Sequence, residues 1–159
     1  MVTVRISDDA LALACGADEV ANAFIKAGHT VERVSSWGMQ WLEPLVEIDG
    51  KGFGPATPAD VAAILDGSSP LAIGEIASHP FIARQQRLTF ARAGKTRPTS
   101  LDDYAATGGW KGLERARAIG SEATIEEVVA SGLRGRGGAG FPTGIKWRTV
   151  GAAKADQKY

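Results

Sequence analysis

A glycine-rich stretch at residues 131–148, SGLRGRGGAGFPTGIKWR, limits most strongly what this chain can fold into. Glycine lacks a Cβ atom, so the backbone of this stretch can adopt positive φ and approach a ligand closely. The stretch also carries Arg134, Arg136, Lys146 and Arg148, and no acidic residue separates the first from the last. Backbone N–H groups in such a loop can hold an anion, and Phe141 can stack on an aromatic ring. The stretch therefore predicts a nucleotide-binding loop.

The sequence around the loop separates it from two common nucleotide motifs. Residues 135–140 match G-x-G-x-x-G, but a Rossmann fingerprint needs a strand before it and a helix after it. The preceding residues predict a helix that begins at Thr124, with Glu127 completing a capping box. Pro142 and Gly144 are expected to prevent a regular helix directly after the loop. A Walker A motif is excluded because Phe-Pro stands where Lys-Ser/Thr is required, and a flexible linker would be richer in serine.

Residues 131–147 closely resemble the FMN-binding loop of the flavoprotein subunit shared by respiratory complex I, NAD-reducing hydrogenases and NAD-dependent formate dehydrogenases. Residues 100–104 (SLDDY), 108–110 (GGW) and 113–116 (LERA) resemble the lead-in to that loop. In that family the loop cradles FMN, and NADH lies over the flavin and passes it a hydride. The resemblance implies FMN and NAD as cofactors of this chain.

Carried over by position, the resemblance also implies roles for single residues. Gly135, Gly137 and Lys146 correspond to contacts with the FMN phosphate and ribityl chain, and Phe141 to the ring that stacks on the adenine of NADH. Cationic side chains near the flavin are expected to raise its potential by stabilising the anionic reduced form. No residue is predicted to be catalytic or to bind a metal. The predicted cofactor-binding residues are Gly135, Arg136, Gly137, Gly138, Gly140, Phe141 and Lys146.

The N-terminal half predicts an α/β (α+β) fold, a small mixed sheet with helices packed on it. Residues 2–6 and 30–34 alternate as strands, and residues 18–27 between them predict a helix with Val20, Phe24 and Ile25 inward. The turn at Asp49-Gly50 predicts a hairpin between residues 45–48 and 51–53.

A second helix is expected from Thr57 as cap and Pro58 as first helical residue. The stretch 66–70 (DGSSP) is the expected linker. The predicted domains are therefore residues 1–68 and residues 69–159, the latter the helical start of an FMN-binding α/β domain.

Residues 14–20 (ACGADEV), 41–44 (WLEP) and 53–55 (FGP) resemble the thioredoxin-like 2Fe–2S domain that accompanies the flavoprotein. That resemblance places Ser7, Ala12, Ser36 and Gln40 where the family has its four cluster cysteines. These residues replace thiolate ligands poorly. We expect a thioredoxin-like fold that has lost its cluster and keeps a docking or structural role, with Trp37 and Trp41 filling core beside the former site.

Composition excludes several other classes of function. Net charge is zero, no apolar run approaches the length of a membrane span, and a single cysteine rules out an internal disulfide. We therefore expect a cytoplasmic protein with no nucleic-acid partner and no membrane insertion. Cys15 is expected to be a small buried side chain, and His29 and His79 to be ordinary surface residues.

Two further features carry smaller expectations. Asp102 and Asp103 are expected to be first-turn acids of a helix after Ser100. The basic segment 84–97 is expected to be a solvated face, with a docking surface for another subunit as the alternative.

The chain resembles an N-terminal fragment, because it stops where the family continues with a strand that completes the FMN site. The 4Fe–4S cluster of the family is expected only in the region beyond. The 159 residues alone are expected to bind FMN weakly or not at all and to lack NADH oxidation.

The sequence thus predicts a diaphorase subunit of a NAD-dependent formate dehydrogenase, with a 2Fe–2S gamma-type subunit and a catalytic alpha-type subunit as partners. The preference for formate dehydrogenase follows from the fused N-terminal domain and its missing cysteines. Alternatives are the same module in a bidirectional NAD-reducing hydrogenase or a complex I-type NADH dehydrogenase, or a non-catalytic docking fragment.

Overall fold

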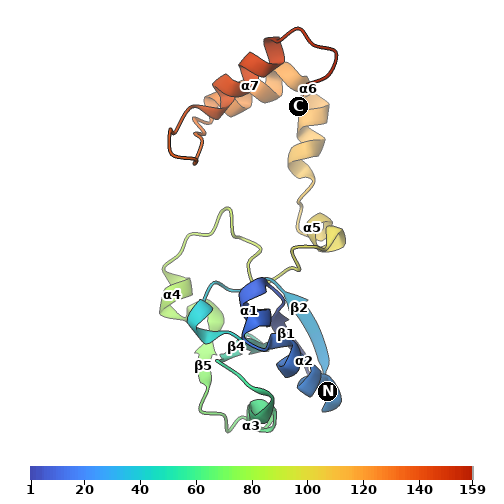
Figure 1. The fold of residues 1–159 in the computed structure, drawn as a ribbon, viewed down its shortest axis with the longest axis vertical. Coiled ribbons are helices and arrows are strands. Elements are labelled where there is room, and N and C mark those ends of the chain that lie inside the picture. Colours follow the sequence, from blue (N-terminus) through green and yellow to red (C-terminus); the bar gives the residue numbers. More distant parts are fainter. Residues whose placement is uncertain (159) are drawn as a thin grey trace. The chain divides into compact units, whose positions relative to one another are not determined.

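A computed structural model describes residues 1–158 (Figure 1), and the chain divides into two compact units. The first unit is Met1–Thr107 and the second begins at Gly108.

The first unit is built on a five-stranded mixed sheet. Its strands are β1 (Thr3–Ser7), β2 (Thr30–Val34), β3 (Val46–Ile48), β4 (Lys51–Phe53) and β5 (Ala72–Glu75), in the order β2-β1-β3-β4-β5. β1 and β2 are parallel, and the other neighbouring pairs are antiparallel. The parallel pair needs a crossover, which α1 (Ala10–Ala14) and α2 (Ala17–Lys26) supply. The chain then passes through η1 (Gln40–Leu42) to the β3–β4 hairpin.

One face of this sheet is covered by helices. Val4 and Ile6 of β1 and Val46 of β3 pack in one buried cluster with Phe24 of α2 and Ile64 of α3 (Val61–Asp66). Because strand residues alternate between faces, Arg5 and Glu47 lie on the opposite face, where they form an ion pair. A smaller cluster there joins Val34, Trp37, Met39, Leu45 and Ile76. This βαβ unit followed by a hairpin and helix is the thioredoxin-like fold that the sequence predicts.

The remaining helical segments of this unit are short. They are η2 (Pro58–Asp60), η3 (Ile76–Ser78), α4 (Pro80–Ala83) and α5 (Leu101–Ala106). The predicted capping at Thr57 is confirmed, since Thr57 and Asp60 form a reciprocal capping box with Pro58 at the start. Asp102 and Asp103 also lie in the first turn of α5, which Ser100 caps by accepting a hydrogen bond from the Asp103 N–H.

Two expectations for this unit need correction. Ile25 is 55% exposed, because α2 buries Val20, Ala21 and Phe24 and turns its next residue to solvent. Residues 66–70 connect α3 to β5 within the same unit, since β5 pairs with β4. The predicted boundary after residue 68 thus falls inside a compact unit. The assignment of residues 69–159 to an FMN-binding domain stays a prediction.

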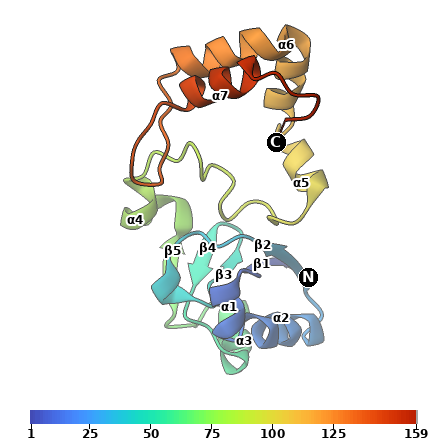
Figure 2. The ribbon, with the colours of Figure 1, turned by 45° about the horizontal axis from the view of Figure 1, so that its top comes forward.

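The second unit is helical. α6 (Lys111–Ala130) and α7 (Thr143–Ala152) lie side by side, as Figure 2 shows. A Cβ added at Gly144 would lie 2.5 Å from Val129, and one added at Gly151 would lie 3.0 Å from Ile125. The two helices are therefore antiparallel and in close contact. No helix within residues 1–158 has the length and apolar character needed to cross a membrane.

Both helix boundaries around the glycine-rich loop differ from the prediction. The preceding helix exists, but α6 joins two helical segments across a kink at Gly120, whose φ of 81° and ψ of 172° are not helical. The second segment follows Gly120 directly, and the Thr124 hydroxyl donates to the Gly120 carbonyl instead of capping. Glu127 pairs with Arg115, which removes it from a capping box. After the loop, α7 begins at once with Pro142 as its N-cap, because proline gives up no needed N–H at a helix start.

Candidate functional site

The loop between α6 and α7 is closed at its base by backbone pairing. Arg134 and Pro142 form an antiparallel bridge, with the Gly135 N–H donating to the Phe141 carbonyl at 2.9 Å and the Thr143 N–H to the Leu133 carbonyl at 2.9 Å. The Arg134 Nε donates to the Gly140 carbonyl at 2.6 Å, across the same loop. The loop is thus a closed turn with its tip at residues 136–139.

Two structural requirements account for some glycines of this region, and Gly137 meets neither of them. Gly138 and Gly140 have φ of 107° and 59°, which a residue with a Cβ adopts only with strain. Gly144 is buried against Val129 and has no room for a Cβ. Gly137 has neither constraint, since its φ is not positive and no atom lies within 4 Å of an added Cβ. Nothing within the described chain requires a glycine at 137, so the open space beside it is suited to the close approach of a ligand.

The tip of the loop also has unused hydrogen-bond donors. Within residues 1–158, the backbone N–H groups of residues 136–140 have no acceptor. The loop is exposed, so these groups are solvated and available. Consecutive free N–H groups at a positive-φ turn form the concave anion site called a nest.

The four cations of the loop region are not equivalent. Arg134 braces the loop, and Arg148 forms an ion pair with Glu126 of α6 at 2.7 Å. Lys146 lies with its Nζ 6.0 Å from the centre of the Phe141 ring, which is 46% exposed. Arg136 and Lys146 have no ion-pair partner in the described chain. Their positive charge therefore remains available to an anionic ligand.

All seven predicted cofactor-binding residues lie in this loop or in the first turn of α7. The donor set suits a phosphate group, and the exposed Phe141 ring suits a flat aromatic group. These features fit a flavin nucleotide, although the roles of single residues stay predictions. The sequence interpretation missed Val129 and Glu126, which fix α7 against α6, because the contact joins residues of two helices that the loop separates.

The second site suggested by the sequence lies in the first unit, around the four positions without cysteine. Ser7 ends β1 and is fully buried, and Ala12 is buried in α1. Ser36 follows β2, and Gln40 is exposed at the start of η1. These residues supply no thiolate, so they do not fit an iron–sulfur cluster.

Two carboxylates link the segments around these positions. Asp9 caps α1, with Oδ1 accepting from the Ala12 N–H at 3.2 Å and Oδ2 from the Ser36 N–H at 3.3 Å. Glu43 is buried and accepts from the Ser36 hydroxyl at 2.7 Å and the Leu45 N–H at 3.0 Å. Burial raises the pKa of Glu43 above its ordinary value, and the hydrogen bonds from Ser36 and Leu45 oppose that rise. Asp9 and Glu43 thus join the segments that contain Ala12, Ser36 and Leu45 in one hydrogen-bonded network.

Other single-residue expectations are resolved differently. Cys15 is exposed, which corrects the expected burial, because α1 turns Ala12 inward and ends before Cys15. Trp37 is buried as expected, but Trp41 is 57% exposed. The Nδ1 atoms of His29 and His79 accept hydrogen bonds from the backbone N–H groups of Val2 and Phe81, so both rings have structural partners.

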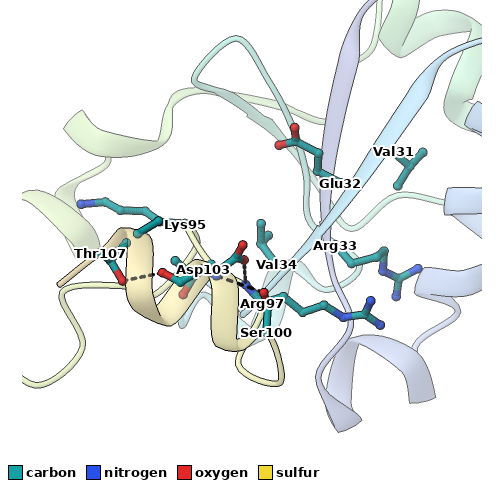
Figure 3. A pocket seen from close by; sticks show the side chains of 11 residues that line it. Val31, Glu32, Arg33, Val34, Lys95, Arg97, Ser100, Asp103 and Thr107 are labelled. Carbon is teal, nitrogen blue, oxygen red and sulfur yellow. Dashed lines mark hydrogen bonds between the residues drawn. The ribbon is translucent and has the colours of Figure 1, made fainter. Parts of the chain in front are cut away.

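A cavity that the sequence did not indicate lies beside the edge strand β2. It has a volume of about 630 Å³ and runs between residues 31–34 and residues 95–107 (Figure 3). Two of its three cations, Arg33 and Arg97, are paired with Asp18 and Asp8 at 2.9 and 2.7 Å, and the third is Lys95. The walls also contain the carboxylates of Glu32 and Asp103, so the cavity does not indicate an anionic ligand.

Comparisons with known proteins confirm the resemblance to the flavoprotein subunits. No protein-family model matches the chain. The NADP-reducing hydrogenase subunit HndC of Solidesulfovibrio fructosivorans is 47% identical over 76 residues, which are 48% of this chain and 16% of that protein. The F subunit of the NADH-quinone oxidoreductase of Aquifex aeolicus is 53% identical over 57 residues, 36% of this chain and 13% of the relative.

A third relative is the NAD-reducing hydrogenase HoxS subunit alpha of Cupriavidus necator. It is 51% identical over 47 residues, 30% of this chain and 8% of the relative. The chain therefore spans a sixth or less of the length of these relatives.

Two solved structures are also similar to this chain. The Cys55Ser variant of the thioredoxin-like [2Fe-2S] ferredoxin from Aquifex aeolicus has a TM-score of 0.39 and 21% identity, over 47% of this chain and all of that chain. An air-oxidized NAD⁺-reducing [NiFe]-hydrogenase has a TM-score of 0.39 and 23% identity, over 93% of this chain and 27% of that chain.

Proposed function

We propose that this chain is the N-terminal part of a diaphorase subunit that passes electrons between NAD(H) and iron–sulfur centres through FMN. The observation that carries the proposal is the tip of the α6–α7 loop. It combines an unconstrained Gly137 with free N–H groups at residues 136–140. The relatives are subunits of NADH-quinone oxidoreductases and of NAD- or NADP-reducing hydrogenases, which makes a NAD-linked oxidoreductase the best-supported class.

The residues of the loop divide the work of holding the cofactor. The N–H groups of residues 136–140 and the Arg136 side chain would take the phosphate, and Gly135 and Gly137 would let the ribityl chain lie against the backbone. Lys146 would supply positive charge near the flavin, and Phe141 a surface for the adenine of NADH. FMN, when bound, supplies the conversion of a two-electron hydride to single electrons, and the protein supplies orientation and electrostatics.

The holoenzyme that we favour is a cytoplasmic NAD-dependent formate dehydrogenase. Support comes from the first unit, a thioredoxin-like domain on the same chain whose former cluster site is closed by Asp9 and Glu43. In this proposal the domain docks the subunit to a 2Fe–2S gamma-type subunit and a catalytic alpha-type subunit. Any 4Fe–4S cluster of the subunit would be held outside these 159 residues.

A NAD-reducing hydrogenase is the second candidate, and the similarity to HndC and to HoxS subunit alpha favours it. The two candidates share the diaphorase step and differ only in the electron donor. The donor can therefore be tested after the flavin site itself.

The test is the visible absorbance of a longer polypeptide that continues past residue 159, recorded with and without NADH. A flavin spectrum that bleaches on addition of NADH would support the diaphorase function, and formate and hydrogen could then be compared as donors. A matched Gly137→Val variant should lose the flavin while keeping its helical circular dichroism. A folded, colourless wild-type protein would instead favour a docking module.

A further inference from the structure

A cluster of exposed apolar side chains lies on the first unit, away from the glycine-rich loop in sequence. Phe90 is 71% exposed, Trp41 57% and Phe81 40%. These three residues are named the aromatic patch. Trp41 and Phe81 meet edge to face with ring centroids 4.9 Å apart, and Phe81 and Phe90 line one hollow of about 260 Å³. Exposed apolar clusters of this kind mark interaction surfaces.

The buried side chain of Trp37 forms part of the wall of the hollow and contacts segment 84–97. Trp37 is only 7% exposed, and the Arg87 guanidinium donates to the Trp37 carbonyl at 2.7 Å. Gly94 lies so close to Trp37 that an added Cβ would clash with the indole ring. Segment 84–97 is thereby held against the rest of the unit, which presents Phe90 beside a preformed pocket.

Segment 84–97 carries Phe90 and is basic, and its Arg87 lines the hollow. Residues 84–97 contain five cationic residues, and residues 76–101 contain no acidic one. Residues 1–83, by contrast, contain eleven acidic and four basic residues. A partner that binds here would therefore gain by presenting carboxylates around an apolar side chain.

We propose that the aromatic patch and segment 84–97 form a docking surface for a partner protein that inserts an apolar side chain, flanked by carboxylates, into the hollow between Phe81 and Phe90. This inference rests on the proposed function in one respect, which is that the chain has partner subunits. It does not depend on flavin binding. Loss of flavin binding and loss of docking would therefore be separate results.

Two other occupants fit the charges less well. An anionic membrane or a nucleic acid is extended, and beside segment 84–97 it would meet the carboxylate of Asp8, which pairs with Arg97. Such an extended anion would also approach the acidic surface of residues 1–83. The second unit carries nine basic and five acidic residues, so it too is poorly matched to a basic surface.

The test is an NMR titration of the ¹⁵N-labelled 159-residue chain with a synthetic peptide, acetyl-EEDFLEDE-amide. We expect shift changes at residues 36–41 and 81–93, and an affinity that falls as salt is added. Peptides with lysine for each acid, or alanine for Phe-Leu, should bind about tenfold more weakly or worse. Phe90→Ser and Arg84→Glu should weaken binding to a similar degree, whereas Leu101→Ser and Lys26→Glu serve as exposed controls and should not.

Several results would overturn the proposal. These are shift changes outside the patch, equal binding of the lysine peptide, or tighter binding to phosphatidylserine vesicles than to the acidic peptide. Shielding of the Leu88 and Phe90 amides from a soluble paramagnetic agent in the free chain would show that the second unit or another copy already covers the surface.

Discussion

The hydrogen-bonded network around Ser36 in the first unit and the glycine-rich loop of the second unit differ in what their polar groups do. Around Ser36, the carboxylates of Asp9 and Glu43 accept hydrogen bonds from side-chain and backbone donors of neighbouring segments. At residues 136–140, backbone donors point to no acceptor in the described chain. The polar groups around Ser36 are satisfied within the unit, whereas the donors of the loop tip have no acceptor within residues 1–158. The comparison teaches that unused donors in a constrained loop are better evidence of binding than a family pattern is.

The largest expected effect separates a packing glycine from the ligand-facing ones. Gly144→Val should destabilise the α6–α7 unit by about 3 kcal/mol, because the new side chain would overlap Val129 including its backbone. Amide hydrogen exchange across α6 and α7 measures this directly. Gly112→Ala, where an added Cβ meets nothing within 4 Å, is the control and should not destabilise the unit. Equal protection in both variants would contradict the packing.

The next effect tests whether the hydrogen-bonded network around Ser36 stabilises the first unit. Asp9→Ala should cost about 2 kcal/mol of unfolding free energy, since it removes the cap of α1 and leaves the Ser36 N–H without its acceptor. Urea unfolding followed by the fluorescence of buried Trp37 provides the measurement. Asp102→Ala, also an acid at the start of a short helix, should change the free energy by no more than about 0.5 kcal/mol. Equal unfolding free energies for the two variants would show that the hydrogen bonds of Asp9 do not stabilise the unit.

Glu43 gives the same site a pH dependence. Its pKa is raised in the folded state above the ordinary value of 4.5, so the folded protein holds the proton to higher pH than the unfolded chain does. The contribution to stability is fully present below pH 4.5 and is lost as pH rises through the folded pKa. Glu43→Gln should flatten the stability curve in that window, with a slope change of at most about 1.4 kcal/mol per pH unit. Parallel curves for the two proteins would show that Glu43 does not titrate there.

How well the sequence predicts a part of the fold or of the site depends on how far apart in the sequence the interacting residues lie. Several local signals succeeded: the Asp49-Gly50 turn, the Thr57 cap and the strand patterns are all present, because each depends on neighbouring residues. The capping box expected at Thr124 failed, because Glu127 pairs with Arg115 instead. Other failures came from distant contacts. The start of α7 depends on Gly144 fitting against Val129, and the exposure of Cys15 depends on which side of α1 faces the core. The seven loop residues lie together as expected because they are close in sequence, whereas the bridge from Asp9 to Ser36 spans 27 positions and left no local signal.

The smallest expected effect on stability is the one that bears most on function. Gly137→Ala should change the unfolding free energy of the α6–α7 unit by less than about 1 kcal/mol, because Gly137 needs neither positive φ nor space within the chain. In the longer polypeptide the same change should weaken FMN binding about tenfold or more, since the added methyl would stand where the ligand approaches the backbone. Fluorescence titration of FMN measures this, with Gly112→Ala as the control of equal chemistry outside the loop. Unchanged stability together with weakened FMN binding would show that Gly137 serves the ligand and not the fold. A Gly137→Ala protein that binds FMN normally would assign the glycines of this loop to the turn alone.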